Sequence, residues 1–382
     1  MSERIVAAFV PLVDCAVLVV AREQGFAAES GIDLVLVKEP SWASLRDHLS
    51  LGHVDCAHAL APLPVALTLG AGHVQVECVA PFVLGRGGNA VTVSNRLFAE
   101  MQGATSSTNP LETGRALAAA ARRRVPPLTF GMVFPFSNHN YDLRYWLAAV
   151  GLHPDRDVRL VAIPPPLMVD SLRAGLVDGF CVGSPWNSLA VAQGLGSIVV
   201  TQSQLFPRAA EKVLALRTAF ADRQRLARLL QALDAAAAWA DDPSNHGMLA
   251  TYLSRPEYLD VPEEIIGAVL GGRLRFGLGA EVRDPDYLYF HRHAANAPLE
   301  ADGLWAYAQM VRWGQLAPSE RAEKAAAKVF NSALYRASIP RASLEVAAPA
   351  PPFDHVEFPS SDVPAYLRQF EMHTPFAVAH SA

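Results

Sequence analysis

The sequence has few cysteines and no surplus of positive charge. Its four cysteines are scattered along 382 residues with no paired spacing: Cys15, Cys56, Cys78 and Cys181. This pattern favours small buried side chains in a reducing compartment over disulfides or a metal cluster. The formal net charge of -5 gives no basic field to hold a phosphate backbone. The basic cluster at residues 122–124 precedes a Pro-Pro pair and is typical of a solvated helix end, so direct nucleic-acid binding is not expected.

Long apolar runs are also lacking. No run of about 18 apolar residues is free of charges and turn signals, which excludes a membrane-spanning helix. The first four residues lead directly into the strand-like Ile5 to Val10, without the basic region and cleavage site that mark a signal peptide. We therefore expect no membrane contact.

The common catalytic motifs are missing as well. The sequence has no Walker-type phosphate loop, no nucleophile elbow and no His-Glu-x-x-His motif. His291 and His293 could share a strand face, but no third ligand lies nearby in the sequence, so we expect no metal site. The sequence thus predicts neither a catalytic centre nor a cofactor.

One local pattern occurs twice. With 51% hydrophobic and 18% charged residues, a chain of this length can bury two cores. Residues 45–57 and 172–180 each read as an amphipathic helix that ends near a glycine and enters a short apolar strand through Val-Asp. Two such units, over a hundred residues apart, indicate two α/β lobes of similar build. A cleft between lobes is a natural place for a small ligand.

The order of predicted elements divides the chain. A strand, helix and strand over residues 5–37 begin a lobe that should hold a parallel sheet covered by helices. The glycine-rich residues 85–89 suit a crossing to the second lobe, and residues 197–201 suit the return. We therefore predict lobe I from residues 1–88 and 200–346, lobe II from 89–199, a two-segment hinge, and a proline-rich C-terminal arm over 347–382.

Hydrogen-bond donors stand at turns where predicted strands end. They are Trp42, Asn89, His139 and Lys212. Trp42 begins a predicted helix, where free N–H groups and the positive end of the dipole favour an anion. Each residue also has a plain alternative: Trp42 in the core, Asn89 in a turn, His139 capping a helix and Lys212 in solvent.

Several segments resemble one family, the nitrate- and bicarbonate-binding proteins of ABC transporters. They lie at residues 9–14, 38–47, 57–62, 144–148, 164–169, 178–187 and 309–314. The similarity covers roughly residues 4–340, and the Trp42 segment together with Gly-Ser-Pro-Trp-Asn at 183–187 is specific. The resemblance implies a type II periplasmic-binding-protein fold, in which a C-shaped clamp closes on a small oxyanion.

The resemblance also implies the anion contacts. By position they fall on Trp42, His139, Lys212 and Asn89, the last where transport members commonly have glutamine. Four further residues would line or brace the pocket: His58, Gly88, Pro185 and Trp186. Nitrate only accepts hydrogen bonds, so indole, amide, imidazole and ammonium groups all suit it.

Transport members of this family carry an export or lipoprotein signal, and this sequence begins at its first strand. It therefore resembles the cytoplasmic NasS-type nitrate/nitrite sensors, which pair with a NasT-type RNA-binding antiterminator protein. We expect a cytoplasmic sensor that binds nitrate, and nitrite too, and passes occupancy to that partner. The alternatives are the binding component of a nitrate/bicarbonate transporter and an enzyme on the same fold, similar to thiamine-pyrimidine synthases.

Overall fold

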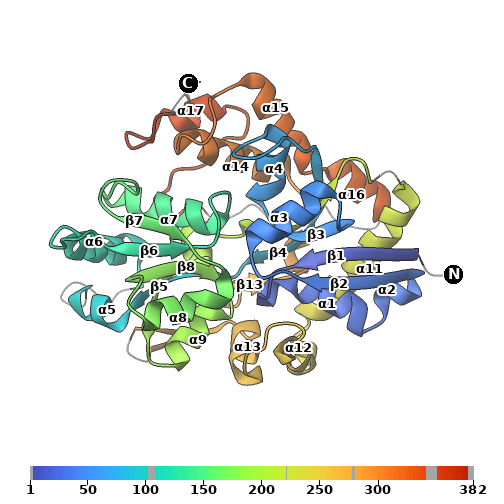
Figure 1. Ribbon diagram of the computed structural model, residues 1–382, viewed down its shortest axis with the longest axis horizontal. Coiled ribbons are helices and arrows are strands. Elements are labelled where there is room, and N and C mark those ends of the chain that lie inside the picture. Colours follow the sequence, from blue (N-terminus) through green and yellow to red (C-terminus); the bar gives the residue numbers. More distant parts are fainter. Residues whose placement is uncertain (1–2, 102–107, 221, 278–279, 341–350, 377–382) are drawn as a thin grey trace.

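The computed structural model describes residues 3–101, 108–220, 222–277, 280–340 and 351–376. It contains two sheets, each flanked by helices, that lie side by side in Figure 1. The first sheet has the strand order β13-β4-β10-β3-β1-β2. Its strands are β1 (Glu3–Phe9), β2 (Ile32–Lys38), β3 (Cys56–Leu60), β4 (Cys78–Gly87), β10 (Ala210–Arg217) and β13 (Leu288–Tyr289).

The second sheet has the order β12-β11-β9-β5-β8-β6-β7. Its strands are β5 (Asn89–Ser94), β6 (Thr129–Met132), β7 (Arg159–Ala162), β8 (Gly179–Gly183), β9 (Gly196–Thr201), β11 (Arg273–Phe276) and β12 (Ala280–Arg283). The helices are α1 (Ala16–Glu23), α2 (Phe26–Glu29), α3 (Trp42–Leu51), α4 (Pro62–Leu69), α5 (Asn95–Met101), α6 (Pro110–Ala121), α7 (Asn138–Ala149), α8 (Met168–Arg173), α9 (Trp186–Ala192), α10 (Gln202–Leu205), α11 (Arg223–Asp241), α12 (His246–Ser254), α13 (Glu263–Leu270), α14 (Glu300–Arg312), α15 (Glu320–Val329), α16 (Ser332–Ser338) and α17 (Val363–Leu367).

The first sheet is mixed, whereas the sequence predicted a parallel one. β1 pairs in parallel with β2 and β3 as expected. β10, however, enters between β3 and β4 and runs antiparallel to both. The sequence analysis missed this strand because Glu211 and Lys212 at its start look like solvated residues, although both are buried. On its return from the second lobe, the polypeptide thus supplies a central strand of the first sheet.

The division into lobes also differs from the expected one in part. Residues 200–346 were all assigned to lobe I, but β11 pairs with β9 and β12 pairs with β11, so both extend the second sheet. The following β13 pairs with β4 in the first sheet. The chain therefore passes between the sheets at more places than the two predicted, because the helices α11 to α13 lead into a strand of the other sheet.

The repeated helix-strand unit is present and carries the same hydrogen bonds in both copies. α3 is followed by Gly52 and α8 by Gly175, both with positive φ. In the first copy Asp55 Oδ2 accepts from the backbone N–H of Val6 at 2.8 Å. In the second, Asp178 Oδ2 accepts from the backbone N–H of Thr129, also at 2.8 Å. Each aspartate thus fastens its own strand to the neighbouring one.

The described part of the C-terminal arm, residues 351–376, packs on both lobes; residues 347–350 and 377–382 of the predicted arm lie outside the described residues. Tyr366 of α17 is buried against α14, and the Tyr145 hydroxyl of α7 donates to Asp354 Oδ2 at 2.8 Å. In Figure 1 this segment lies near α14 and α15. None of the helices within the described ranges is long and apolar enough to cross a bilayer.

Candidate functional site

The four donors singled out in the sequence meet where the two lobes face each other. Trp42 begins α3, and Lys212 lies in β10 of the first sheet. Asn89 begins β5, and His139 lies in the first turn of α7, both in the second lobe. None of these side chains is more than 1% exposed. The structure therefore brings together residues that are up to 170 positions apart in the sequence, as Trp42 and Lys212 are.

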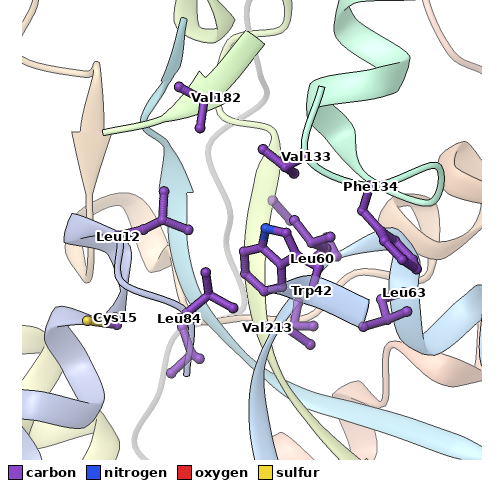
Figure 2. Packing of buried hydrophobic residues seen from close by; sticks show 14 of the residues in the cluster. Leu12, Cys15, Trp42, Leu60, Leu63, Leu84, Val133, Phe134, Val182 and Val213 are labelled. Atoms are coloured by element: carbon purple, nitrogen blue, oxygen red, sulfur yellow. The ribbon is translucent and has the colours of Figure 1, made fainter. Parts of the chain in front are cut away.

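Trp42 combines a core position with an unused donor. Ser41 caps α3 by accepting from the Ser44 backbone N–H, which fixes Trp42 in the first turn. In Figure 2 the indole packs among buried apolar side chains, and its nitrogen lies on the side of Val133 and Val182 of the second lobe. This nitrogen has no hydrogen-bond partner among the described residues. Trp42 is thus both a core residue and an available N–H.

Gly183 leaves room beside two of the polar groups. Asn89 pairs with Gly183 across β5 and β8. A Cβ atom at Gly183 would lie 3.4 Å from Asn89 Oδ1, 3.5 Å from His139 Nε2 and 2.9 Å from Leu12 Cδ2. The amide of Asn89 and both ring nitrogens of His139 have no partner of good geometry within the described structure. The missing side chain at position 183 therefore keeps a small polar space between them.

His139 is positioned by the N-terminus of α7. Ser137, and not His139, caps this helix, since its Oγ accepts from the backbone N–H of Asn140 at 3.1 Å. Asn138 donates from Nδ2 to the Ala210 carbonyl across the lobes at 2.7 Å. Trp42 and His139 thus both lie at helix N-termini, where the helix dipole favours an anion.

Lys212 is held between two carboxylates. Its Nζ lies 2.8 Å from Asp14 Oδ2 and 2.8 Å from Glu211 Oε1, and 5.6 Å from the centre of the Trp42 ring. Burial favours the neutral amine, but Asp14 and Glu211 outweigh it and raise the pKa of Lys212. The alternative of a solvated lysine is therefore wrong, and the site contains a fixed positive charge.

His58 supports this ion pair. Its Nε2 lies 2.8 Å from Asp14 Oδ1, on the oxygen that Lys212 does not contact. Burial lowers the pKa of His58 despite the nearby Asp14, so the ring is neutral and Nε2–H is the tautomer that can donate to the carboxylate. Burial opposes ionisation of Asp14, yet Lys212 and His58 hold the Asp14 pKa below its usual value. His58 therefore braces the site through Asp14.

Gln202 links Glu211 to a third buried acid, Asp142. Gln202 Nε2 donates both to Asp142 Oδ2 at 2.9 Å and to Glu211 Oε2 at 3.0 Å. Burial raises the pKa of both acids, that of Asp142 well above its usual value. The sequence analysis missed all three buried acids. Asp142 had a signal, since it follows His139 by three positions in a helix and so shares its face.

The other predicted residues brace the contact between the lobes. The Gly88 carbonyl accepts from the Ser184 backbone N–H at 2.9 Å and from the Tyr287 hydroxyl at 2.9 Å. Trp186 Nε1 donates to the Pro11 carbonyl in the first lobe at 3.1 Å. Pro185 is buried between Ser184 and the start of α9. The indole N–H of Trp186 is thus used in a bond between the lobes, and the Gly88 carbonyl is used at the crossing.

Comparison with known families decides the relationship. The sequence profile of the NMT1-like family matches residues 2–254, about two thirds of the chain. The protein belongs to the NMT1-like family. The nitrate/nitrite binding protein NrtA of Synechococcus elongatus is 33% identical to it over 377 residues, which are 94% of this chain and 84% of that protein.

A crystal structure confirms the fold expected for this NMT1-like protein. The periplasmic nitrate-binding protein NrtA from Synechocystis PCC 6803 superimposes with a TM-score of 0.89 at 27% identity, over 97% of this chain and 99% of that one. The expected periplasmic-binding-protein fold with two α/β lobes is therefore present.

Other relatives are longer than this chain. The nitrate import ATP-binding protein NrtC of Synechocystis is 39% identical over 313 residues, which are 81% of this chain but 46% of that protein. The chain thus spans about half the length of the ATP-binding proteins it matches.

Within the described ranges, no group of three or more His, Cys, Asp or Glu side chains could hold a metal ion.

Proposed function

We propose that this protein binds nitrate, and nitrite as well, between its two lobes. One observation carries the proposal: Trp42, Asn89 and His139 present buried polar atoms without partners at the lobe interface. Buried donors of this kind are normally satisfied, and leaving each unpaired costs about 1–3 kcal/mol. Relatives that share the fold are named nitrate-binding proteins, which supports nitrate as the acceptor.

A small anion with a single charge fits the charges of the site better than a dianion does. Lys212 contacts Asp14 and Glu211, and these two acids already offset its positive charge. A dianion such as sulfate would add more negative charge to a dry site, where charges are poorly screened. His139 Nδ1 lies 3.6 Å from Glu211 Oε1. An anion at Nε2 would therefore favour the imidazolium, with Nδ1–H facing Glu211 and Nε2–H facing the anion.

Replacing the Trp42 indole by a smaller ring without an N–H tests the site. Trp42→Phe keeps an aromatic ring in the core but loses the donor, so nitrate affinity should fall by a factor of about 10–100, the equivalent of a hydrogen bond to a charged group. Isothermal titration calorimetry with nitrate, nitrite, bicarbonate and sulfate measures this change. Trp239→Phe is the matched control and should bind like the wild type, since the Trp239 indole of α11 stacks on Tyr252 of α12. Equal affinity of Trp42→Phe and wild type would contradict the assignment.

The names of the relatives favour a transport component. We propose that the protein delivers nitrate to an ATP-driven importer, as the binding components of such systems do. A strain that lacks the protein should then take up less nitrate from micromolar medium, and uptake should return with the wild-type protein but not with Trp42→Phe. Nitrate should leave the protein chemically unchanged, whereas consumption of nitrate would point to an enzyme.

The sensor role remains a separate prediction. A cytoplasmic protein that controls a NasT-type antiterminator would hold its partner in one lobe arrangement and release it in the other, since a ligand shifts such an equilibrium through its differential affinity. Co-expression followed by gel filtration with and without nitrate tests this role. A complex that dissociates on nitrate addition would establish sensing, while the lack of any complex would leave transport.

A further inference from the structure

Asp142 occupies a buried position with one oxygen unused. It lies on α7 one turn after His139 and is 1% exposed. Its Oδ2 accepts from Gln202 Nε2 at 2.9 Å, whereas its Oδ1 is buried without a partner of good geometry. The ion pairs found among the described residues include none to Asp142. A carboxylate in such a place would carry an uncompensated buried charge.

The surrounding charges leave no cation for Asp142. The titratable and charged groups around Asp142 and its neighbours come from five elements. They are Glu211 and Lys212 of β10, Cys181 of β8, Asp14 of η1 (Val13–Cys15), His58 of β3 and His139 of α7. Lys212 is the positive member and contacts two carboxylates already. Burial and the adjacent Glu211 raise the Asp142 pKa, which agrees with this count of charges. Asp142 therefore lacks the neighbouring cation that would stabilise its ionised form.

A neutral Asp142 has a consequence for Asn89. A side-chain hydrogen bond joins Asn89 to the Asp142 carboxyl group and acts against burial to lower the Asp142 pKa, while Asn89 Oδ1 lies on the side of Gly183. The oxygen and nitrogen of an amide exchange places by a half turn, and their assignment follows from the hydrogen bonds that surround them. An ionised Asp142 would attract the Asn89 NH2 and leave the carbonyl oxygen facing the anion. A protonated Asp142 instead donates from Oδ1 to that carbonyl oxygen.

We propose that Asp142, as a neutral acid, is a positioning residue that turns the Asn89 amide so that its NH2 faces the bound anion. This role rests on the proposed nitrate binding. Gln202 fixes the arrangement, because its donation to Oδ2 leaves Oδ1 to carry the proton. Nitrate affinity then depends on the protonation of a group that does not touch nitrate.

The test compares wild type, Asp142→Asn and Asp142→Leu by calorimetric titration with nitrate. In Asp142→Asn the amide NH2 replaces the acid O–H as donor to Asn89, and the amide oxygen still accepts from Gln202. At about pH 6 this variant should bind within roughly twofold of wild type, and at about pH 9, where documented buried carboxyls ionise, the wild type should bind about tenfold more weakly than the variant. Asp142→Leu should lose about tenfold at both pH values.

Burial and Lys212 hold the pKa of His139 well below its usual value. Both act in wild type and in Asp142→Asn alike, so the difference between the two profiles isolates Asp142. Parallel profiles, or an Asp142→Asn variant that loses binding at the lower pH, would overturn the positioning role. A wild type that does not bind nitrate at either pH overturns the proposed function, and the inference with it.

Melting temperatures without nitrate give a second readout, independent of binding. Asp142 keeps its proton in the folded protein, while in the unfolded chain it ionises near its usual pKa of about 4. The folding stability of the wild type therefore falls as the pH rises above that value, until Asp142 ionises in the folded state. Asp142→Asn has no such proton, so its melting temperature should exceed that of wild type by a margin that widens with pH. A constant margin would mean that Asp142 is ionised.

Discussion

Replacing Lys212 by methionine should abolish nitrate binding and lower the free energy of unfolding by about 3–5 kcal/mol, the usual effect of breaking a buried ion pair. The reason is that Lys212 is the ammonium group paired with both Asp14 and Glu211, each at 2.8 Å, so its loss leaves these acids without a cation in a dry site. Lys212→Glu should be worse, because it adds one more negative charge. Chemical denaturation and calorimetry measure the two effects.

A double variant separates the loss of binding from the loss of stability. Asp14→Asn in the Lys212→Met background removes one stranded charge and should recover part of the stability, while nitrate binding stays absent because the cation is gone. Lys324→Met is the control, since Lys324 forms an exposed pair with Glu320 in α15 and should change neither quantity measurably. A Lys212→Met protein that binds nitrate like the wild type would refute this assignment.

Gly183→Val should remove nitrate binding, with a loss of about a hundredfold or more, equivalent to about 2.7 kcal/mol. The added methyl groups would occupy the space between Asn89 and His139, where an unbranched Cβ already comes within 3.5 Å of both residues. The 2.9 Å approach to Leu12 involves the end of a flexible side chain, so the fold should survive with a loss of about 1–3 kcal/mol.

Gly247→Ala is the matched control for this substitution. Gly247 lies in α12, and a Cβ there would meet nothing within 4 Å. This variant should bind nitrate like the wild type and melt at the same temperature or slightly higher. If Gly183→Val binds nitrate with unchanged affinity, the anion does not lie beside β8, and the proposed site is wrong.

Local patterns predicted much of the fold. The amphipathic units before Asp55 and Asp178 indicated two similar lobes, and both units are present with matching hydrogen bonds. The start of α3 at Trp42 followed from Ser41, which is a common helix cap. What failed was the assignment of β10, since a strand that begins with Glu211 and Lys212 breaks the apolar pattern of a buried strand.

The electrostatics of the site could not be predicted from local patterns. Asp14 and Lys212 lie nearly two hundred positions apart, and no periodicity links a residue of the first loop to a central strand of a later crossing. The resemblance to nitrate-binding proteins pointed to positive and neutral donors, so carboxyl groups beside an anion were not expected. Only the folded structure shows that Gln202 donates to both Asp142 and Glu211.

The burial of the four donors has a kinetic consequence. Because Trp42, Asn89, His139 and Lys212 are at most 1% exposed, solvent ions cannot reach them while the lobes keep this contact. Entry and exit therefore require the hydrogen bonds from Trp186 and Asn138 to the other lobe to break first. In a rapid-mixing experiment the observed association rate should level off as nitrate concentration rises, at the frequency with which the lobes separate. The residence time of the ion is then set by the contact between the lobes as much as by the donors that hold it.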